Sequence, residues 1–128
     1  MSLPEADEDL VLLHNPRCSK SRTAKALLEE NGVTFVTRNY LEDPLSVHEL
    51  RDLAKRLDSE PSTWVRKGES VFDKFLLNED SSAGDWIEAI VEEPVLLERP
   101  ILIAGLRAVV ARPPENVLDL VFRAGLTR

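Results

Sequence analysis

The side chains best suited to chemistry gather around Cys18, the only cysteine of the chain. Several polar or cationic residues stand within four positions of it: His14, Arg17, Lys20, Ser21 and Arg22. Cations beside a thiol, and the free N–H groups at a helix start, favour the thiolate and attract an anion. We therefore expect Cys18 to be a nucleophile that attacks an oxyanion, with His14 and Ser21 tuning its reactivity. On these residues alone, an inert cysteine and an ordinary loop histidine remain open alternatives.

The spacing around Cys18 argues against other thiol chemistries. A tyrosine-phosphatase-like loop needs a longer separation than the three residues between Cys18 and Arg22. A dithiol oxidoreductase needs a second cysteine where Ser21 stands, and a single cysteine cannot form an internal disulfide. One cysteine and two histidines cannot supply a closed zinc site without carboxylates at recognisable spacing, so we expect no bound metal.

The chain around Cys18 predicts a strand, a tight loop and a helix. The apolar run 10–13 leads into the turn signal 14–16 and is typical of a buried strand. Helical spacing of apolar residues then continues to Asn31-Gly32, a usual helix end. Residues 33–40 are rich in β-branched side chains and predict a second strand. This βαβ unit pairs the two strands in parallel and puts Cys18 at the helix N-terminus.

The rest of the chain predicts more helices and a hairpin. Ser46 and Glu49 have the spacing of a capping box at the start of an amphipathic helix. Further helical segments follow at 62–65, 71–76 and 85–93. Residues 102–104 and 108–111 flank a glycine-containing turn and predict a β-hairpin, and Pro113-Pro114 opens a last helix. The order βαβ, helical insertion, ββα resembles the thioredoxin-like folds. It predicts an α/β architecture with a mixed four-stranded sheet and covering helices.

Length and charge indicate one acidic domain. The chain has 128 residues and a net charge of −7, which argues against a nucleic-acid or anionic-membrane surface. It contains neither an apolar stretch of about 20 residues nor a secretory signal, and a lone cysteine fits a reducing compartment. We expect a cytoplasmic monomer, with a disordered acidic tail over 1–9 and a single domain over 10–128.

Several motifs, in the same order along the chain, resemble the glutaredoxin-coupled arsenate reductases. The loop from His14 to Arg22 is similar to the signature loop of that family. Four later segments match as well: Tyr40 to Pro44, Trp64 to Lys67, Glu98 to Ile101 and Ala111 to Leu118. The likeness covers nearly the whole chain, although Arg17 and Ser19 stand where the best-known enzymes have small residues.

The resemblance implies a reaction and a site. It implies that Cys18 attacks arsenate, and that the substrate-binding residues are Asn15, Arg66, Arg99 and Arg112. Arginine suits this role because its planar fork of donors stays charged. Pro100 matches a proline that is cis in thioredoxin-like folds. The implied reaction passes through a Cys18–arsenic adduct to arsenite without a bound cofactor. Glutathione is the external reductant, and a glutaredoxin resolves the mixed disulfide.

Two alternatives share the same fold. Spx-like regulators bind RNA polymerase and are not catalytic, but they typically carry a Cys-x-x-Cys pair and lack the arginine set. The arginines of this chain therefore favour an enzyme. The other alternative is a thiol oxidoreductase with a different substrate.

Overall fold

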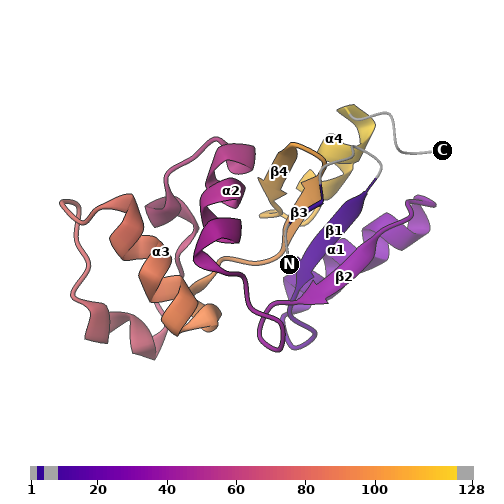
Figure 1. Cartoon of the computed structure of the whole chain (residues 1–128). Coiled ribbons are helices and arrows are strands. Elements are labelled where there is room, and N and C mark those ends of the chain that lie inside the picture. Colours follow the sequence, from indigo (N-terminus) through magenta and orange to yellow (C-terminus); the bar gives the residue numbers. More distant parts are fainter. Residues whose placement is uncertain (1–2, 5–8, 124–128) are drawn as a thin grey trace.

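The computed structural model describes residues 3–4 and 9–123 of the chain (Figure 1). Its strands and α-helices are β1 (Leu10–His14), α1 (Ser19–Glu30), β2 (Val36–Asn39), α2 (Val47–Leu57), α3 (Ala83–Glu92), β3 (Ile101–Ala104), β4 (Arg107–Val110) and α4 (Asn116–Arg123). Short 3₁₀ helices cover Pro61–Trp64, Ser70–Phe75 and Pro94–Leu96. The predicted order, βαβ, helical insertion, ββα, is confirmed. Among the described helices, none has the length and apolar character needed to cross a bilayer.

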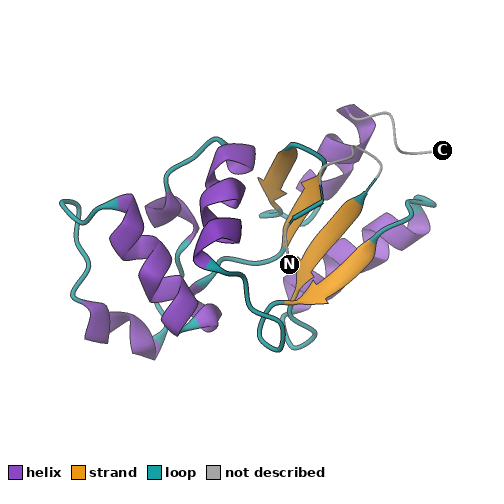
Figure 2. Ribbon diagram, viewed as in Figure 1, coloured by secondary structure: helices purple, strands orange, loops and turns teal. Residues whose placement is uncertain are grey.

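The four strands form one mixed sheet in the order β2-β1-β3-β4 (Figure 2). β1 and β2 are parallel and pair His14 with Asn39, so their carboxyl ends meet at one edge of the sheet. β3 runs antiparallel to both β1 and β4. The register places the residues that follow β1 and β2 side by side, which brings Tyr40 next to the loop that carries Cys18.

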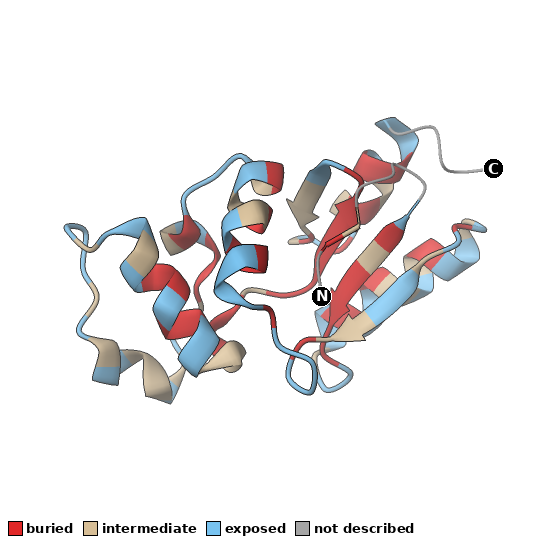
Figure 3. Cartoon of the chain, viewed as in Figure 1, coloured by how far each residue is buried: buried red, intermediate tan, exposed pale blue. Residues whose placement is uncertain are grey.

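Each central strand contributes to two hydrophobic clusters because its side chains alternate between the faces of the sheet. Leu10 and Leu12 pack with apolar residues of α1 and α4, whereas Leu13 packs with those of α2 and α3. The side chains of β3 alternate between the same two clusters, and the strand is buried along its whole length (Figure 3). Figure 1 accordingly shows α1 and α4 on one side of the sheet and α2 on the other, with α3 beyond α2.

Some predicted boundaries differ from the structure for local reasons. The second strand covers only Val36–Asn39, because the N–H of Val33 donates to Leu28 O and closes the end of α1 instead of joining the sheet. α3 begins earlier than predicted because Ser82 and Asp85 form a second capping box. The segments predicted as helical at 62–65 and 71–76 are 3₁₀ rather than α.

Two residues of the N-terminal segment expected to be disordered lie against the folded domain. Leu3 is buried in the cluster that contains Leu13, and Pro4 O accepts a hydrogen bond from Arg56. Residues 1–2 and 5–8 of that segment lie outside the described part of the chain.

An ion pair stabilises the connection between β2 and α2. Arg38 donates to both carboxylate oxygens of Glu49, at 2.6 and 3.1 Å, while Glu49 also completes the predicted capping box with Ser46. Burial raises the pKa of Glu49, but the hydrogen bonds and charge of Arg38 and the N–H of Ser46 outweigh it and the pKa is lowered. A lowered carboxyl pKa stabilises the fold above the unfolded-state pKa, and this stabilisation disappears as the pH falls through the folded-state value.

We expect Glu49→Gln to reduce the free energy of unfolding by about 2 kcal/mol at neutral pH, because a charged hydrogen-bonded pair is lost in a nearly buried position. Asp43, 3.3 Å from Arg38 Nε, limits the loss. Urea unfolding of both proteins across a pH series would measure it. The difference should narrow below about pH 4, where the wild-type carboxyl is protonated in the unfolded chain. A difference that stays constant down to pH 2 would contradict the assignment.

Candidate active site

The loop after β1 places Cys18 as the N-cap residue of α1, as predicted. Its turn is closed by a hydrogen bond of 3.0 Å from Cys18 N to Asn15 O, and Asn15 Oδ1 accepts from Arg17 N at 3.0 Å. The N–H of Asn15 points to Ser21 Oγ at 3.4 Å, so Ser21, fully buried on the first turn of α1, joins both ends of the loop. The thiol itself is half-buried.

The pKa of the Cys18 thiol is lowered. Burial acts in the opposite direction and is the largest single contribution, but several donors favour the thiolate and together outweigh it: the N–H groups of Ser21 and Lys20, the Ser21 hydroxyl and Arg99. The Cys18 side chain does not accept a conventional N-cap hydrogen bond. These groups therefore stabilise the thiolate through their combined partial positive charge near the start of α1. The structure therefore favours a reactive thiolate at the start of α1.

The origin of this lowered pKa differs from the sequence-based expectation. Arg17, Lys20 and Arg22 have exposed side chains, and Arg22 donates to Pro16 O rather than to the sulfur. The main contributions come from the backbone of α1, from Ser21 and from Arg99, which is distant in sequence. Burial first, and then the charges of Lys25 and Arg22, lower the pKa of His14. His14 is thus neutral at neutral pH and does not act on the thiol as a cation.

We expect the pH dependence of Cys18 alkylation to report this environment. The rate of reaction with the neutral reagent iodoacetamide should reach half of its maximum clearly below about pH 8.5, the value of a free thiol. Ser21→Ala should move that midpoint upward, because one of the donors to the thiolate is removed. Stopped samples analysed by mass spectrometry over a pH series would give both midpoints. A native midpoint at or above that of a free thiol would show that the loop does not activate the sulfur.

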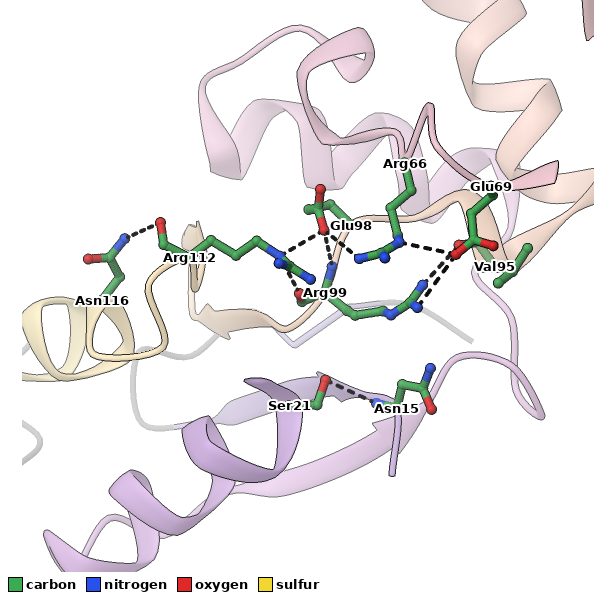
Figure 4. A network of polar contacts seen from close by, with 9 residues as sticks. All are labelled: Asn15, Ser21, Arg66, Glu69, Val95, Glu98, Arg99, Arg112 and Asn116. Atoms are coloured by element: carbon green, nitrogen blue, oxygen red, sulfur yellow. Dashed lines mark hydrogen bonds and ion pairs between the residues drawn. The ribbon is translucent and has the colours of Figure 1, made fainter. Parts of the chain in front are cut away.

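The predicted arginines come from three separate segments and meet in one network (Figure 4). Arg99 follows the Pro94–Leu96 turn, is buried, and donates to Val95 O at 3.1 Å. It is also among the groups that lower the pKa of the Cys18 thiol, which connects the network electrostatically to the sulfur. The shared carboxylate of Glu98 joins Arg66 and Arg112 to the backbone of Arg99, and Arg112 Nε donates to Arg99 O at 2.9 Å. The structure thus gathers all three arginines in one network.

Two carboxylates hold these guanidinium groups. Glu98 Oε1 lies 3.2 Å from Arg66 Nη1 and 2.8 Å from Arg112 Nε. Glu69 Oε1 lies 3.3 Å from Arg66 Nε and 3.6 Å from Arg99 Nη2. An open hollow of about 420 Å³ lies over this network and is lined by Val65, Arg66, Lys67, Gly68, Glu69, Glu98 and Arg112. A larger hollow of about 600 Å³ lies between α2 and α3 and contains neither the thiol nor the three arginines.

Tyr40 is a further residue at this site. It follows β2, is 1 % exposed, and its hydroxyl has no hydrogen-bond partner within the described residues. Burial raises the pKa of Tyr40, while the nearby guanidinium of Arg99 opposes the rise. Arg99 Nε also lacks a partner in the described structure, so each of these two neighbouring side chains has a buried polar atom without a hydrogen bond.

The predicted site residues therefore fall into two groups. Ser21 and Arg99 both lower the pKa of the Cys18 thiol, and Arg66 and Arg112 join Arg99 through the carboxylates. Asn15 uses its side-chain oxygen to shape the loop, and its contact with substrate stays a prediction. The sequence reasoning assigned no role to Tyr40, Glu69 or Glu98, although all three stand within or beside the matching segments. The expected cis bond before Pro100 is present, and a second one precedes Pro113.

Fold and site together define a thioredoxin-like α/β domain with one thiol at a helix start, facing a set of arginines. The chain belongs to the ArsC family, whose model matches residues 13–120. It is 43% identical over 112 residues to the uncharacterized protein YfgD of Escherichia coli, covering 86% of this chain and 94% of that protein. It is 39% identical over 114 residues to an arsenate reductase of Haemophilus influenzae, covering 88% of this chain and 98% of that protein.

A solved structure supports the same assignment. The chain superposes on the arsenate reductase of Vibrio cholerae with a TM-score of 0.83 at 38% identity, over 88% of this chain and 97% of that one. At this identity and coverage, the mixed sheet, the Cys18 loop and the helical insertion all fall within the shared fold.

Proposed function

We propose that this protein is an arsenate reductase that uses glutathione and glutaredoxin as its source of electrons. The observation that carries the proposal is the network that gathers Arg66, Arg99 and Arg112, because it is suited to a tetrahedral oxyanion and includes Arg99, a group that lowers the pKa of the Cys18 thiol. The Haemophilus and Vibrio relatives, which are named arsenate reductases, support the same substrate.

In the proposed first step, arsenate binds to Arg99, Arg66 and Arg112. Their guanidinium groups neutralise its charge and hold the arsenic near the sulfur. The Cys18 thiolate attacks arsenic, a sulfur–arsenic bond forms, and one arsenate oxygen leaves as water after accepting protons. Arsenic remains pentavalent in this adduct. The donors at the start of α1 lower the pKa of the thiol and so supply the thiolate.

In the second step, the thiolate of glutathione attacks the sulfur of Cys18. The electron pair of the sulfur–arsenic bond passes to arsenic, which becomes trivalent and leaves as arsenite. Cys18 and glutathione are oxidised together to a mixed disulfide. Because the chain has no second cysteine, an external thiol must reduce that disulfide, and a glutaredoxin suits this role. The proposal needs no bound cofactor and is compatible with a cytoplasmic monomer.

A regulator on the same fold is the competing proposal. Such a protein would bind a partner through its surface and would gain nothing from a buried arginine that lowers the pKa of a thiol. Arg99 is buried, donates to Val95 O and lowers the pKa of Cys18, which favours catalysis. The other alternative, a thiol oxidoreductase with a different substrate, would also use Cys18 as its nucleophile but would not reduce arsenate.

A coupled assay separates these functions. The protein is mixed with arsenate, glutathione, glutaredoxin, glutathione reductase and NADPH, and the loss of NADPH absorbance is followed. We expect consumption that depends on arsenate and on each protein component. Consumption with a glutathione mixed disulfide but not with arsenate would instead indicate the general thiol oxidoreductase. No consumption by the folded protein in either assay would refute the enzymatic proposal.

A further inference from the structure

The arginine network contains more cationic than anionic side chains. Three guanidinium groups, from Arg66, Arg99 and Arg112, are matched by only two carboxylates, from Glu69 and Glu98. Figure 4 shows both carboxylates among the guanidinium groups, where the oxygens of a bound oxyanion would also find donors. An anion that binds here must either share these donors with the carboxylates or replace one of them.

Glu98 is firmly built into the network. A single oxygen, Oε1, accepts hydrogen bonds from Arg66 Nη1 at 3.2 Å and from the backbone N–H of Arg99 at 3.3 Å, and forms an ion pair with Arg112 Nε at 2.8 Å. The backbone of Glu98 is fixed as well, because its N–H donates to Trp64 O at 2.8 Å and the adjoining Leu97 forms a β-bridge with Val65. Glu98 thus joins the segments of all three arginines, so its removal would separate them.

Glu69 is held more weakly. Its carboxylate makes two ion pairs, at 3.3 Å to Arg66 Nε and 3.6 Å to Arg99 Nη2, the latter beyond hydrogen-bond length. It stands at the end of the turn 66–69, where its N–H donates to Arg66 O at 3.3 Å, and its side chain is 27% exposed. Ion pairs with this much solvent contact are weak, so little free energy holds Glu69 in place.

Glu69 nevertheless contacts the most important arginine. Arg99 Nη2 lies 3.6 Å from Glu69 Oε1, and Arg99 is also the arginine that helps to lower the pKa of Cys18. Glu69 also pairs with Arg66, so one partly exposed carboxylate engages two of the three guanidinium groups. With both carboxylates present the five side chains carry a net charge of +1, and moving Glu69 away would leave +2 for an anion.

We propose that the two carboxylates have opposite roles at this site: Glu98 is a positioning residue that holds the arginines together, and Glu69 is an exchangeable internal anion that a substrate oxyanion displaces from Arg99 and Arg66. The inference rests on the proposed function for the identity of the oxyanion. Glu69 occupies the donors while the site is empty and swings toward solvent when a more highly charged anion arrives. Glu98 remains bound in both states.

The opposite roles predict opposite effects of the same chemical change. The measured quantity is the arsenate concentration that halves the rate of Cys18 alkylation by iodoacetamide. Glu69→Gln should lower this concentration roughly fivefold, because the internal competitor is removed and its donors are freed. Glu98→Gln should raise it roughly tenfold, because the arginines lose the negative charge that holds them together. Glu60→Gln is the matched control, since Glu60 is exposed and makes no ion pair within the described residues.

The outcomes are distinguishable from those of the proposed function. Tighter protection in Glu69→Gln, together with an unchanged Glu60→Gln, supports the displaced anion. Equal or weaker protection in Glu69→Gln overturns it, even if the native enzyme reduces arsenate normally. Because Glu69 stands in an exposed turn, this variant should fold, and its melting temperature is checked first.

Glu98→Asp gives a second measurement at the other position: tighter protection of Cys18 by arsenate in this variant would contradict the positioning role of Glu98. Protection of the native protein by sulfate without arsenate turnover would remove the proposed substrate but leave the inference about the carboxylates intact.

Discussion

Replacing Cys18 with serine should abolish arsenate reduction. A serine hydroxyl has a far higher pKa than a thiol and is not oxidised to a disulfide, so neither the attack on arsenic nor the electron transfer can occur. The chain has no other thiol that could substitute for it. Because the loop is closed by backbone and by Ser21, the variant should fold normally. Turnover in the coupled assay should fall below detection, a loss of roughly four or more orders of magnitude.

Binding of the oxyanion provides the control for this variant. Cys18→Ser retains Arg66, Arg99 and Arg112, so arsenate should still raise its melting temperature as it does for the native protein. If Cys18→Ser binds arsenate but does not reduce it, the sulfur of Cys18 is needed for the reduction and not for binding. If Cys18→Ser kept even a few per cent of the turnover, Cys18 would not be the nucleophile.

Arg99→Ala should reduce kcat/KM for arsenate by roughly two or more orders of magnitude, since each factor of ten corresponds to about 1.4 kcal/mol of lost transition-state stabilisation. Arg99 acts on the Cys18 thiol and also pairs with Glu69 in the network, and its side chain is only 10% exposed. Its removal also takes away one of the groups that lower the pKa of Cys18. Steady-state kinetics at several pH values would separate the loss of anion binding from the loss of thiolate.

Arg66→Ala provides a graded comparison. Its side chain is more exposed and belongs to the turn 66–69, so its removal should lower kcat/KM less than that of Arg99. Arg112→Ala should resemble Arg99→Ala, because Arg112 bonds to the backbone of Arg99 as well as to Glu98. Equal activity in the native protein and Arg99→Ala would exclude the arginine set from catalysis.

Sequence patterns predicted the framework because they depend on local interactions. The apolar run before Cys18 and the capping box of Ser46 and Glu49 are local signals, and both are confirmed. A second capping box, Ser82 with Asp85, has aspartate where the usual sequence pattern has glutamate or glutamine, so the pattern does not predict it and α3 starts earlier than predicted. The length of β2 was overestimated because β-branched residues do not decide where pairing with β1 begins.

The candidate site was less predictable because its contacts join distant segments. Position in the sequence favours Arg17, Lys20 and Arg22 as the groups that tune the thiol, but all three are exposed in the structure. Arg99 lowers the pKa of the thiol instead, and only the resemblance to a known family points to it. The role of Glu98 depends on a contact with Arg66, 32 residues away, which no local pattern encodes.

In the proposed reaction, arsenate binds covalently to the Cys18 sulfur, and glutathione then displaces arsenite and forms a mixed disulfide with Cys18. The most direct measurement omits glutaredoxin and follows the intact mass of the protein with arsenate and fully reduced glutathione. We expect one glutathionyl group to appear on Cys18, in step with the arsenite released, and neither to appear when sulfate replaces arsenate or in Cys18→Ser. Arsenite formation without modification of Cys18, or an unmodified protein and no arsenite, would contradict the account.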